Sequence, residues 1–176
     1  IDEMAEKVDP SENEYYLYVG RVSKEKGVEL FCEAITKLGY KGIVVGDGEE
    51  KSKLEKKFIN IEFAGWKDSC EVKKYMKKAR ALIFPSRWYE GSPLTPFEAM
   101  QYGVPCLSSN VTSVIEYTKE TGRVFELNVN SLIENIEEYE KNIYEYSRKS
   151  YEYIQKKKEN KYSENILNFY NKIITN

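Results

Sequence analysis

Two glutamates, Glu90 and Glu98, stand eight positions apart and carry the clearest chemical signal in the sequence. Glu90 comes shortly after the apolar run 81–84, which has the pattern of a buried strand. Glu98 lies within residues 93–102, a predicted helix that prolines open and Gly103 closes. Backbone N–H groups at the start of such a helix bind phosphate or diphosphate. Two carboxylates that flank this anion site suit a ligand with hydroxyls on both sides of its phosphates, such as a nucleotide sugar.

A purely structural role for Glu98 is the alternative. Thr95 and Glu98 have the spacing of a capping box, in which both side chains bond to backbone N–H groups at the start of a helix. Glu90 follows Trp88 and Tyr89 in a strand-to-helix loop, and open α/β sheets bind ligands outside the carboxyl ends of their strands. We therefore expect Glu90 to contact a ligand and leave both roles open for Glu98.

Composition excludes several classes of function. The chain has 176 residues, and its 27 basic and 29 acidic side chains nearly cancel, so its charge does not indicate nucleic-acid binding. No apolar stretch approaches the ~20 residues of a membrane span, and no signal peptide opens the chain. The three cysteines are widely spaced and the chain has no histidine, so no metal site is predicted. We expect a reducing, cytoplasmic setting, at most at the inner face of the membrane.

Apolar runs alternate with amphipathic stretches along the chain. Strands are predicted at residues 15–19, 42–45, 61–64, 81–84, 105–108 and 122–126. Helical segments are predicted at residues 29–38, 72–78, 93–102, 113–118 and 131–174, the last with a break near Asn160. A further charged helix is predicted to follow Gly48 and to end at about residue 58. This order predicts an α/β fold, a doubly wound parallel sheet of about six strands with helices on both faces and a long C-terminal helical segment. We expect residues 1–14 to be an arm or a linker remnant, and residues 15–176 to be one nucleotide-sugar-binding, Rossmann-like domain.

The segment after the first predicted strand offers cations for a diphosphate. Gly20 lets the backbone approach a ligand, and Arg21 and Lys26 supply two positive charges. The segment is not a Walker A loop, because its second glycine is not followed by Lys-Ser/Thr. An ordinary exposed turn capped by Ser23 is the alternative.

Two further loops could hold the rest of a nucleotide. Gly46 and Gly48 follow the second strand but lack the third glycine of a dinucleotide fingerprint, which argues against an NAD-binding domain. They instead predict a tight turn against which a base or ribose can lie. Trp66 and Lys67 follow the third strand and could line a base pocket, although simple core packing is an equal alternative for Trp66.

Taken in order, these segments resemble the donor-binding half of the retaining nucleotide-sugar glycosyltransferases of family 4, which have the GT-B architecture. The resemblance runs from about Tyr15 to the C-terminal helix. It rests on Gly20-Arg21 with Lys26-Gly27, Gly46-Asp47-Gly48-Glu49, Phe63-Ala64-Gly65, Pro85-Ser86, the paired glutamates, Ala99-Met100, Gly103-Val104-Pro105, Ser109-Asn110, Glu116 and Gly122. Residues 88–95 are most similar to the mannosyltransferase branch.

This chain departs from the family pattern at two places. Ser92 stands where the family usually has an aromatic residue, which concerns the shape of the sugar pocket. Thr112 and Ser113 stand where it usually has a Gly-Gly pair.

The resemblance also implies roles for single residues. Arg21 and Lys26 would bind the diphosphate together with backbone N–H groups of residues 91–94, Glu90 would hold the sugar hydroxyls, and Glu98 would bind the ribose. The implied catalytic residues are Glu90, Arg21 and Lys26. The implied donor-binding residues are Gly20, Arg21, Lys26, Gly46, Gly48, Trp66, Lys67, Glu90, Gly91, Ser92, Leu94, Thr95 and Glu98.

The function implied by the resemblance is hexosyl transfer, with mannose as the expected sugar. The donor would be GDP-mannose or another nucleoside diphosphate sugar, and the acceptor a glycan or glycolipid of polysaccharide biosynthesis. No cofactor and no metal are expected, because two cations and a helix N-terminus neutralise the diphosphate and the chain has no Asp-x-Asp segment.

The expected partner is an acceptor domain, N-terminal in the same polypeptide or in a separate chain. This chain alone would be inactive, and any peripheral membrane contact would be made through the other domain. The alternatives are a noncatalytic nucleotide-sugar-binding subunit, a sugar-nucleotide epimerase and a glycogen-synthase-like enzyme.

Overall fold

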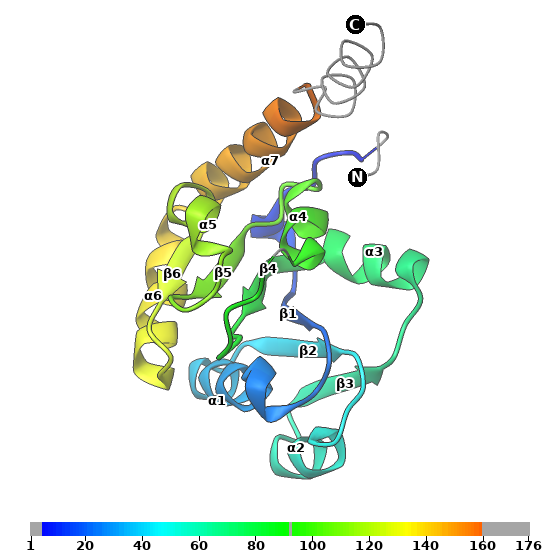
Figure 1. The fold of residues 1–176 in the computed structure, drawn as a ribbon. Coiled ribbons are helices and arrows are strands. Elements are labelled where there is room, and N and C mark those ends of the chain that lie inside the picture. The colour runs from blue at the N-terminus through cyan, green and yellow to red at the C-terminus, as the bar shows by residue number, and fades with distance from the viewer. Residues whose placement is uncertain (1–4, 92, 160–176) are drawn as a thin grey trace, which may run out of the picture.

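The computed structural model describes residues 5–91 and 93–159, which contain one six-stranded sheet with the strand order β3-β2-β1-β4-β5-β6. All five strand pairs are parallel. The strands are β1 (Tyr15–Val19), β2 (Lys41–Val45), β3 (Ile61–Gly65), β4 (Ala79–Phe84), β5 (Cys106–Ser109) and β6 (Arg123–Phe125). The predicted doubly wound parallel sheet is confirmed (Figure 1).

The helices follow the predicted order. They are α1 (Val28–Leu38), α2 (Lys51–Lys57), α3 (Ser69–Lys77), α4 (Leu94–Met100), α5 (Ile115–Thr121), α6 (Val129–Lys141) and α7 (Ile143–Glu159), with short 3-10 turns at η1 (Pro10–Glu12) and η2 (Lys24–Lys26). Helix α3 begins earlier than predicted, because Asp68 and Glu71 form a capping box at its start. The C-terminal helical segment is interrupted at Asn142, a break that the sequence pattern missed. The predicted break near Asn160 lies outside the described residues.

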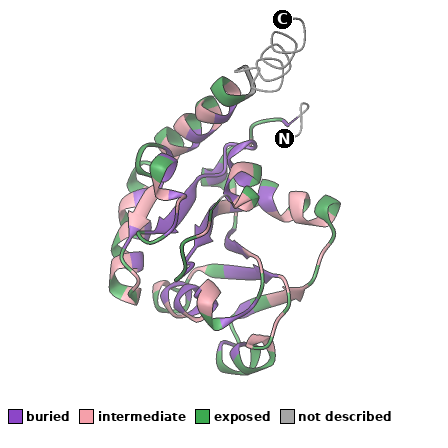
Figure 2. Ribbon diagram, viewed as in Figure 1, coloured by how far each residue is buried: buried purple, intermediate pink, exposed green. Residues whose placement is uncertain are grey.

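Strand β1 shows how the two faces of the sheet are covered. Tyr16 and Tyr18 belong to a buried cluster with side chains of α1, α2 and α6. Tyr15 and Leu17 belong to a second cluster with side chains of α3, α4, α5 and α7. Successive side chains of a strand point to opposite faces, so both faces of β1 are buried, as in other parallel sheets. Figure 2 shows this burial along the central strands.

Residues 5–14, the described part of the predicted arm, contact the sheet domain. The backbone N–H of Val8 donates to the carbonyl of Tyr102, and the side chain of Asn13 donates to the carbonyl of Ala79 at 2.8 Å. Pro10 is buried. Among the described residues, no helix combines the length and the apolar composition that crossing a membrane requires.

An ion pair near the amino ends of the strands joins α6 to the sheet. Arg80 donates to both carboxylate oxygens of Glu140, with Nε–Oε1 at 2.9 Å and Nη2–Oε2 at 2.5 Å, and the hydroxyl of Tyr16 also donates to this carboxylate. Arg80 also donates to the carbonyls of Ser11 and Asn13. Burial favours a higher pKa for Glu140, but the hydrogen bonds from Arg80 and Tyr16 outweigh it and hold the pKa below the ordinary value of 4.5.

We predict that Glu140→Gln lowers the free energy of unfolding at neutral pH by about 1.5–3 kcal/mol, because hydrogen bonds to a charged group are lost. The folded-state pKa is depressed, so the wild-type contribution is complete above 4.5 and disappears as the pH falls through the lower folded value. Urea unfolding of both proteins between about pH 7 and pH 3 should therefore show their stabilities converging in acid. Glu138→Gln, in the exposed pair with Lys141, is the control and should change nothing measurable. If Glu140→Gln lowered the free energy of unfolding by the same amount at every pH, the loss could not come from the charge of Glu140.

Candidate functional site

The predicted ligand loops meet at the switch point of the sheet. Strands β1 and β4 are neighbours, but the chain continues from β1 to β2 on one side and from β4 to β5 on the other. In open α/β sheets, ligands bind in the crevice outside the carboxyl ends of the strands at such a point. The segment 20–27 follows β1 and the segment 85–93 follows β4, so the topology places both in this crevice.

Close backbone packing holds these two segments together. Gly27 has a positive φ of 69°, and a Cβ atom there would lie only 2.0 Å from the carbonyl oxygen of Pro85. The backbone N–H of Arg87 donates to the carbonyl of Glu25 at 2.8 Å. The end of the first segment therefore rests directly on the chain that leaves β4.

This packing brings Lys26 and Glu90 into an ion pair with 2.6 Å between Nζ and Oε1. The side chains are 30% and 18% exposed, so the pair is partly shielded from water. It borders a cavity of about 210 Å³ that also contains Gly20, Arg21 and Thr95. The full lining is Tyr18, Val19, Gly20, Arg21, Lys26, Phe84, Pro85, Ser86, Glu90, Pro93 and Thr95. Five of the predicted donor-binding residues thus share one cavity.

Tyr18 supports the floor of this cavity. Its hydroxyl donates to the carbonyl of Arg21 at 2.7 Å. Burial, followed by the negative charges of Glu90 and Glu25, raises the pKa of Tyr18 far above its usual range. The phenol therefore stays protonated at every physiological pH and holds the backbone of Arg21 in place.

A second cavity of about 370 Å³ adjoins the first and shares Gly20 and Arg21 with it. It is lined by Val19, Gly20, Arg21, Val45, Gly46, Asp47, Trp66, Lys67 and Val72. Trp66 is 73% exposed, so the core-packing alternative for it was wrong. At Gly46 a Cβ atom would lie 1.9 Å from the carbonyl oxygen of Gly20. This glycine is needed for the loops after β1 and β2 to touch each other.

Several predicted residues lie outside both cavities. Gly91, Leu94 and Glu98 are exposed and line neither of them. Gly48 packs against the backbone of Val22, and a Cβ atom there would lie 2.3 Å from the carbonyl oxygen of that residue. Ser92 is not among the described residues.

The capping-box alternative for Glu98 was wrong. Helix α4 begins at Leu94, with Pro93 in the N-cap position and no side-chain hydrogen bond at the cap. Thr95 therefore lies inside the first turn and cannot act as the capping residue.

Hydroxyl groups from the end of β5 and from the loop after it hold the segment that carries Glu90. Ser113 donates to the backbone carbonyl of Glu90, with a longer contact of 3.3 Å to the carbonyl of Gly91. Ser109 donates to the carbonyl of Ser86 at 2.5 Å. Sequence analysis assigned no role to Ser113. The departure that could have indicated this role is that Ser113 stands where the resemblance predicts a glycine.

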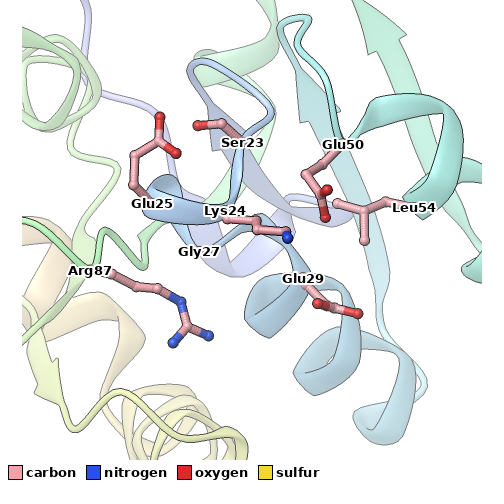
Figure 3. Close-up of a pocket in the computed structure, with 8 residues that line it drawn as sticks. All are labelled: Ser23, Lys24, Glu25, Gly27, Glu29, Glu50, Leu54 and Arg87. Atoms are coloured by element: carbon pink, nitrogen blue, oxygen red, sulfur yellow. The ribbon is translucent and has the colours of Figure 1, made fainter.

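Another cavity of about 370 Å³ lies beside the segment 23–27 (Figure 3). Lys24 and Arg87 approach it from the loops after β1 and β4. Its lining is Ser23, Lys24, Glu25, Gly27, Glu29, Glu50, Leu54 and Arg87. None of these residues belongs to the predicted donor-binding set. Three carboxylates in one lining also oppose a diphosphate, so this cavity is a poor candidate for the anion site.

Comparisons with known proteins identify the family of this chain. The family model described as glycosyl transferases group 1 matches residues 1–160. Over 110 residues the chain is 34% identical to lipopolysaccharide 1,6-galactosyltransferase of Salmonella typhimurium, which covers 56% of this chain and 30% of that protein. Over 107 residues it is 34% identical to a putative teichuronic acid biosynthesis glycosyltransferase of Bacillus subtilis, covering 60% and 27% of the two proteins.

A solved structure shares the fold. The structure of Anabaena HepE in complex with UDP superposes with a TM-score of 0.73 over 84% of this chain and 45% of that one, at 16% identity. The chain spans only 27% to 36% of the length of the curated relatives that it matches. Because the family model extends from before the first strand into the last helix, the chain belongs to the glycosyl transferases of group 1.

Proposed function

We propose that this chain is the donor-binding domain of a retaining glycosyltransferase and binds a nucleoside diphosphate sugar at the β1/β4 switch point. The observation that carries the proposal is that Arg21, Lys26 and Glu90 border one cavity there. Two cations suit a diphosphate, and a carboxylate beside them suits the hydroxyls of a sugar attached to it.

The two adjoining cavities suit the two parts of such a ligand. Gly20 and Arg21 belong to both, so a diphosphate there would connect a nucleoside in the Trp66 cavity with a sugar beside Glu90. The exposed face of Trp66 can stack on a base, and Lys67 lies in the same lining. Glu98 remains the proposed partner of the ribose hydroxyls, which it would contact from the first turns of α4.

In the proposed reaction the anomeric bond to the diphosphate breaks and negative charge develops on the leaving oxygen. Arg21 and Lys26 stabilise this charge, together with backbone N–H groups of the loop that precedes α4. Pro93 has no N–H, so the hydrogen-bond donors among the described residues are Gly91 in that loop and Leu94 at the first position of α4. Glu90 orients the sugar. The acceptor oxygen bonds to the anomeric carbon on the face that the diphosphate leaves, and the leaving phosphate accepts the proton of that acceptor hydroxyl.

The binding site for the acceptor is proposed to lie on a second domain or on a partner chain. Trp88, Tyr89 and Leu94 are 67%, 75% and 69% exposed in the segment that runs from β4 into α4. Such a group of exposed apolar side chains beside a ligand cavity is typical of a surface that another domain covers. The curated relatives are also about twice as long as this chain, which leaves room for such a domain.

Mannose stays the predicted donor sugar and GDP-mannose the first donor to test, with the product a surface polysaccharide or glycolipid. One named relative is a putative teichuronic acid biosynthesis glycosyltransferase, and the other is a lipopolysaccharide 1,6-galactosyltransferase. A noncatalytic nucleotide-sugar-binding subunit is the second candidate, and transfer activity after addition of the acceptor domain would exclude it.

We predict that the chain alone binds UDP, GDP or ADP in calorimetry and that Arg21→Ala weakens the tightest of them. The expected loss is about 1.5–3 kcal/mol, the range for hydrogen bonds to charged groups. Arg87→Ala is the matched control, because Arg87 lines the neighbouring cavity, and it should leave binding unchanged. If no nucleoside diphosphate binds the folded wild-type chain at millimolar concentration, the proposed function is wrong.

A further prediction concerns Glu98. Glu98→Gln should weaken binding of the preferred nucleoside diphosphate about fivefold to tenfold without changing the melting temperature, because a charge-assisted bond to the ribose is lost. The 2′,3′-dideoxy form of the same nucleotide lacks both hydroxyls and should bind wild type and variant equally. An equal loss for both nucleotides would place the effect of Glu98 outside the ribose.

A further inference from the structure

Lys26, one of the two cations proposed to bind the diphosphate, already forms an ion pair with Glu90. Nζ of Lys26 lies 2.6 Å from Oε1 of Glu90, and the Glu90 side chain is only 18% exposed. Ser113 donates to the backbone carbonyl of Glu90 and so restrains the position of this residue. A ligand that enters this cavity must therefore bind Lys26 next to a fixed negative charge.

We infer that Glu90 is a specificity-determining residue that disfavours the free nucleoside diphosphate relative to the nucleotide sugar. The inference rests on the proposed function, since it takes the nucleotide sugar as the ligand of this site. It adds that the same carboxylate acts in opposite directions on the donor and on the product that the donor leaves behind.

The charges of the two ligands provide the reason. In a nucleotide sugar, one oxygen of the terminal phosphate is esterified to the sugar and carries no charge. In the free nucleoside diphosphate the same oxygen is ionised, because the second pKa of a terminal phosphate is about 6. If Glu90 binds the sugar, that oxygen lies on the Glu90 side of the diphosphate, and its added charge faces the carboxylate.

The net charge of the site strengthens this effect. Arg21 and Lys26 contribute two positive charges to the cavity, and Glu90 removes one of them. Two negative charges a few ångströms apart repel each other much more strongly in a partly shielded site than in bulk water. The donor compensates by hydrogen bonds between its sugar and Glu90, whereas the free diphosphate has no group that can do so.

The test compares three ligands on wild type and Glu90→Gln by calorimetry. The ligands are the nucleoside diphosphate among UDP, GDP and ADP that wild type binds most tightly, its nucleotide sugar, and its methyl ester at the terminal phosphate. Glu90→Gln should bind the free diphosphate about threefold to tenfold more tightly, because the substitution removes the carboxylate charge that faces the ionised terminal phosphate and pairs with Lys26. Its affinity for the nucleotide sugar should fall, so the preference for the sugar form shrinks.

The methyl ester tests the inference on the wild-type chain alone, independently of how the variant folds. It removes one negative charge without adding a sugar. Wild type should bind the ester more tightly than the free diphosphate, and Glu90→Gln should not distinguish the two in this way.

Two controls separate charge from other causes. Ser113→Ala loosens the attachment of the Glu90 loop but leaves every charge in place, so it should not improve binding of the free diphosphate. Glu29→Gln removes a carboxylate that pairs with Lys57 and should leave all three affinities unchanged.

The failures are distinguishable. If no ligand binds wild type, the proposed function fails. If the ligands bind but Glu90→Gln does not improve binding of the free diphosphate, the inference fails and the proposed function stands. An equal improvement in Ser113→Ala would also overturn the inference, because the gain would then come from a looser loop.

Discussion

The contact between Gly27 and Pro85 is the constraint on which the site depends. Residue 27 has no room for a side chain, because its Cβ position lies 2.0 Å from a carbonyl oxygen of the chain leaving β4. This contact joins two loops from neighbouring strands at the switch point of the sheet. It explains how Lys26 and Glu90, 64 positions apart in the sequence, come within ion-pair distance.

The end of β5 and the loop after it add a second support. Ser109 at the end of β5 and Ser113 in the loop donate to the backbone carbonyls of Ser86 and Glu90, so side-chain hydroxyls bind main-chain acceptors of the segment after β4. Such bonds satisfy carbonyls that the parallel ladder leaves unpaired beyond the end of β4. The segment with Glu90 is therefore held from both neighbouring strands, and a carboxylate on a short loop acquires a defined position.

The amino end of the sheet is built on different physics. There Arg80 and Glu140 form an ion pair, and each has further hydrogen-bond partners. Tyr16 also donates to the carboxylate, and the guanidinium also donates to two backbone carbonyls. Helix α6 is fixed to the sheet by this cluster. At the carboxyl end, charged groups of the loops after β1 and β4 border a cavity, whereas the Arg80–Glu140 pair at the amino end is enclosed by other groups of the protein.

The sequence was sufficient to predict the class of fold and the order of the elements, because buried strands and amphipathic helices have different periodicities. It also identified Gly20, Arg21, Lys26, Glu90 and Thr95, which the structure brings into one cavity. Helix ends were less certain, as the break at Asn142 shows, because periodicity continues across a local change of backbone direction.

Contacts between side chains of distant segments are a property of the folded chain. Sequence spacing cannot reveal that Glu90 pairs with Lys26 or that Ser113 holds the Glu90 loop, since these contacts join segments from different strands. The folded structure also distinguishes between alternatives that local patterns left equal: Trp66 is exposed and Thr95 does not cap α4. The physical reason is that periodicity and capping patterns are local, whereas burial and ion pairing depend on what the rest of the chain places nearby.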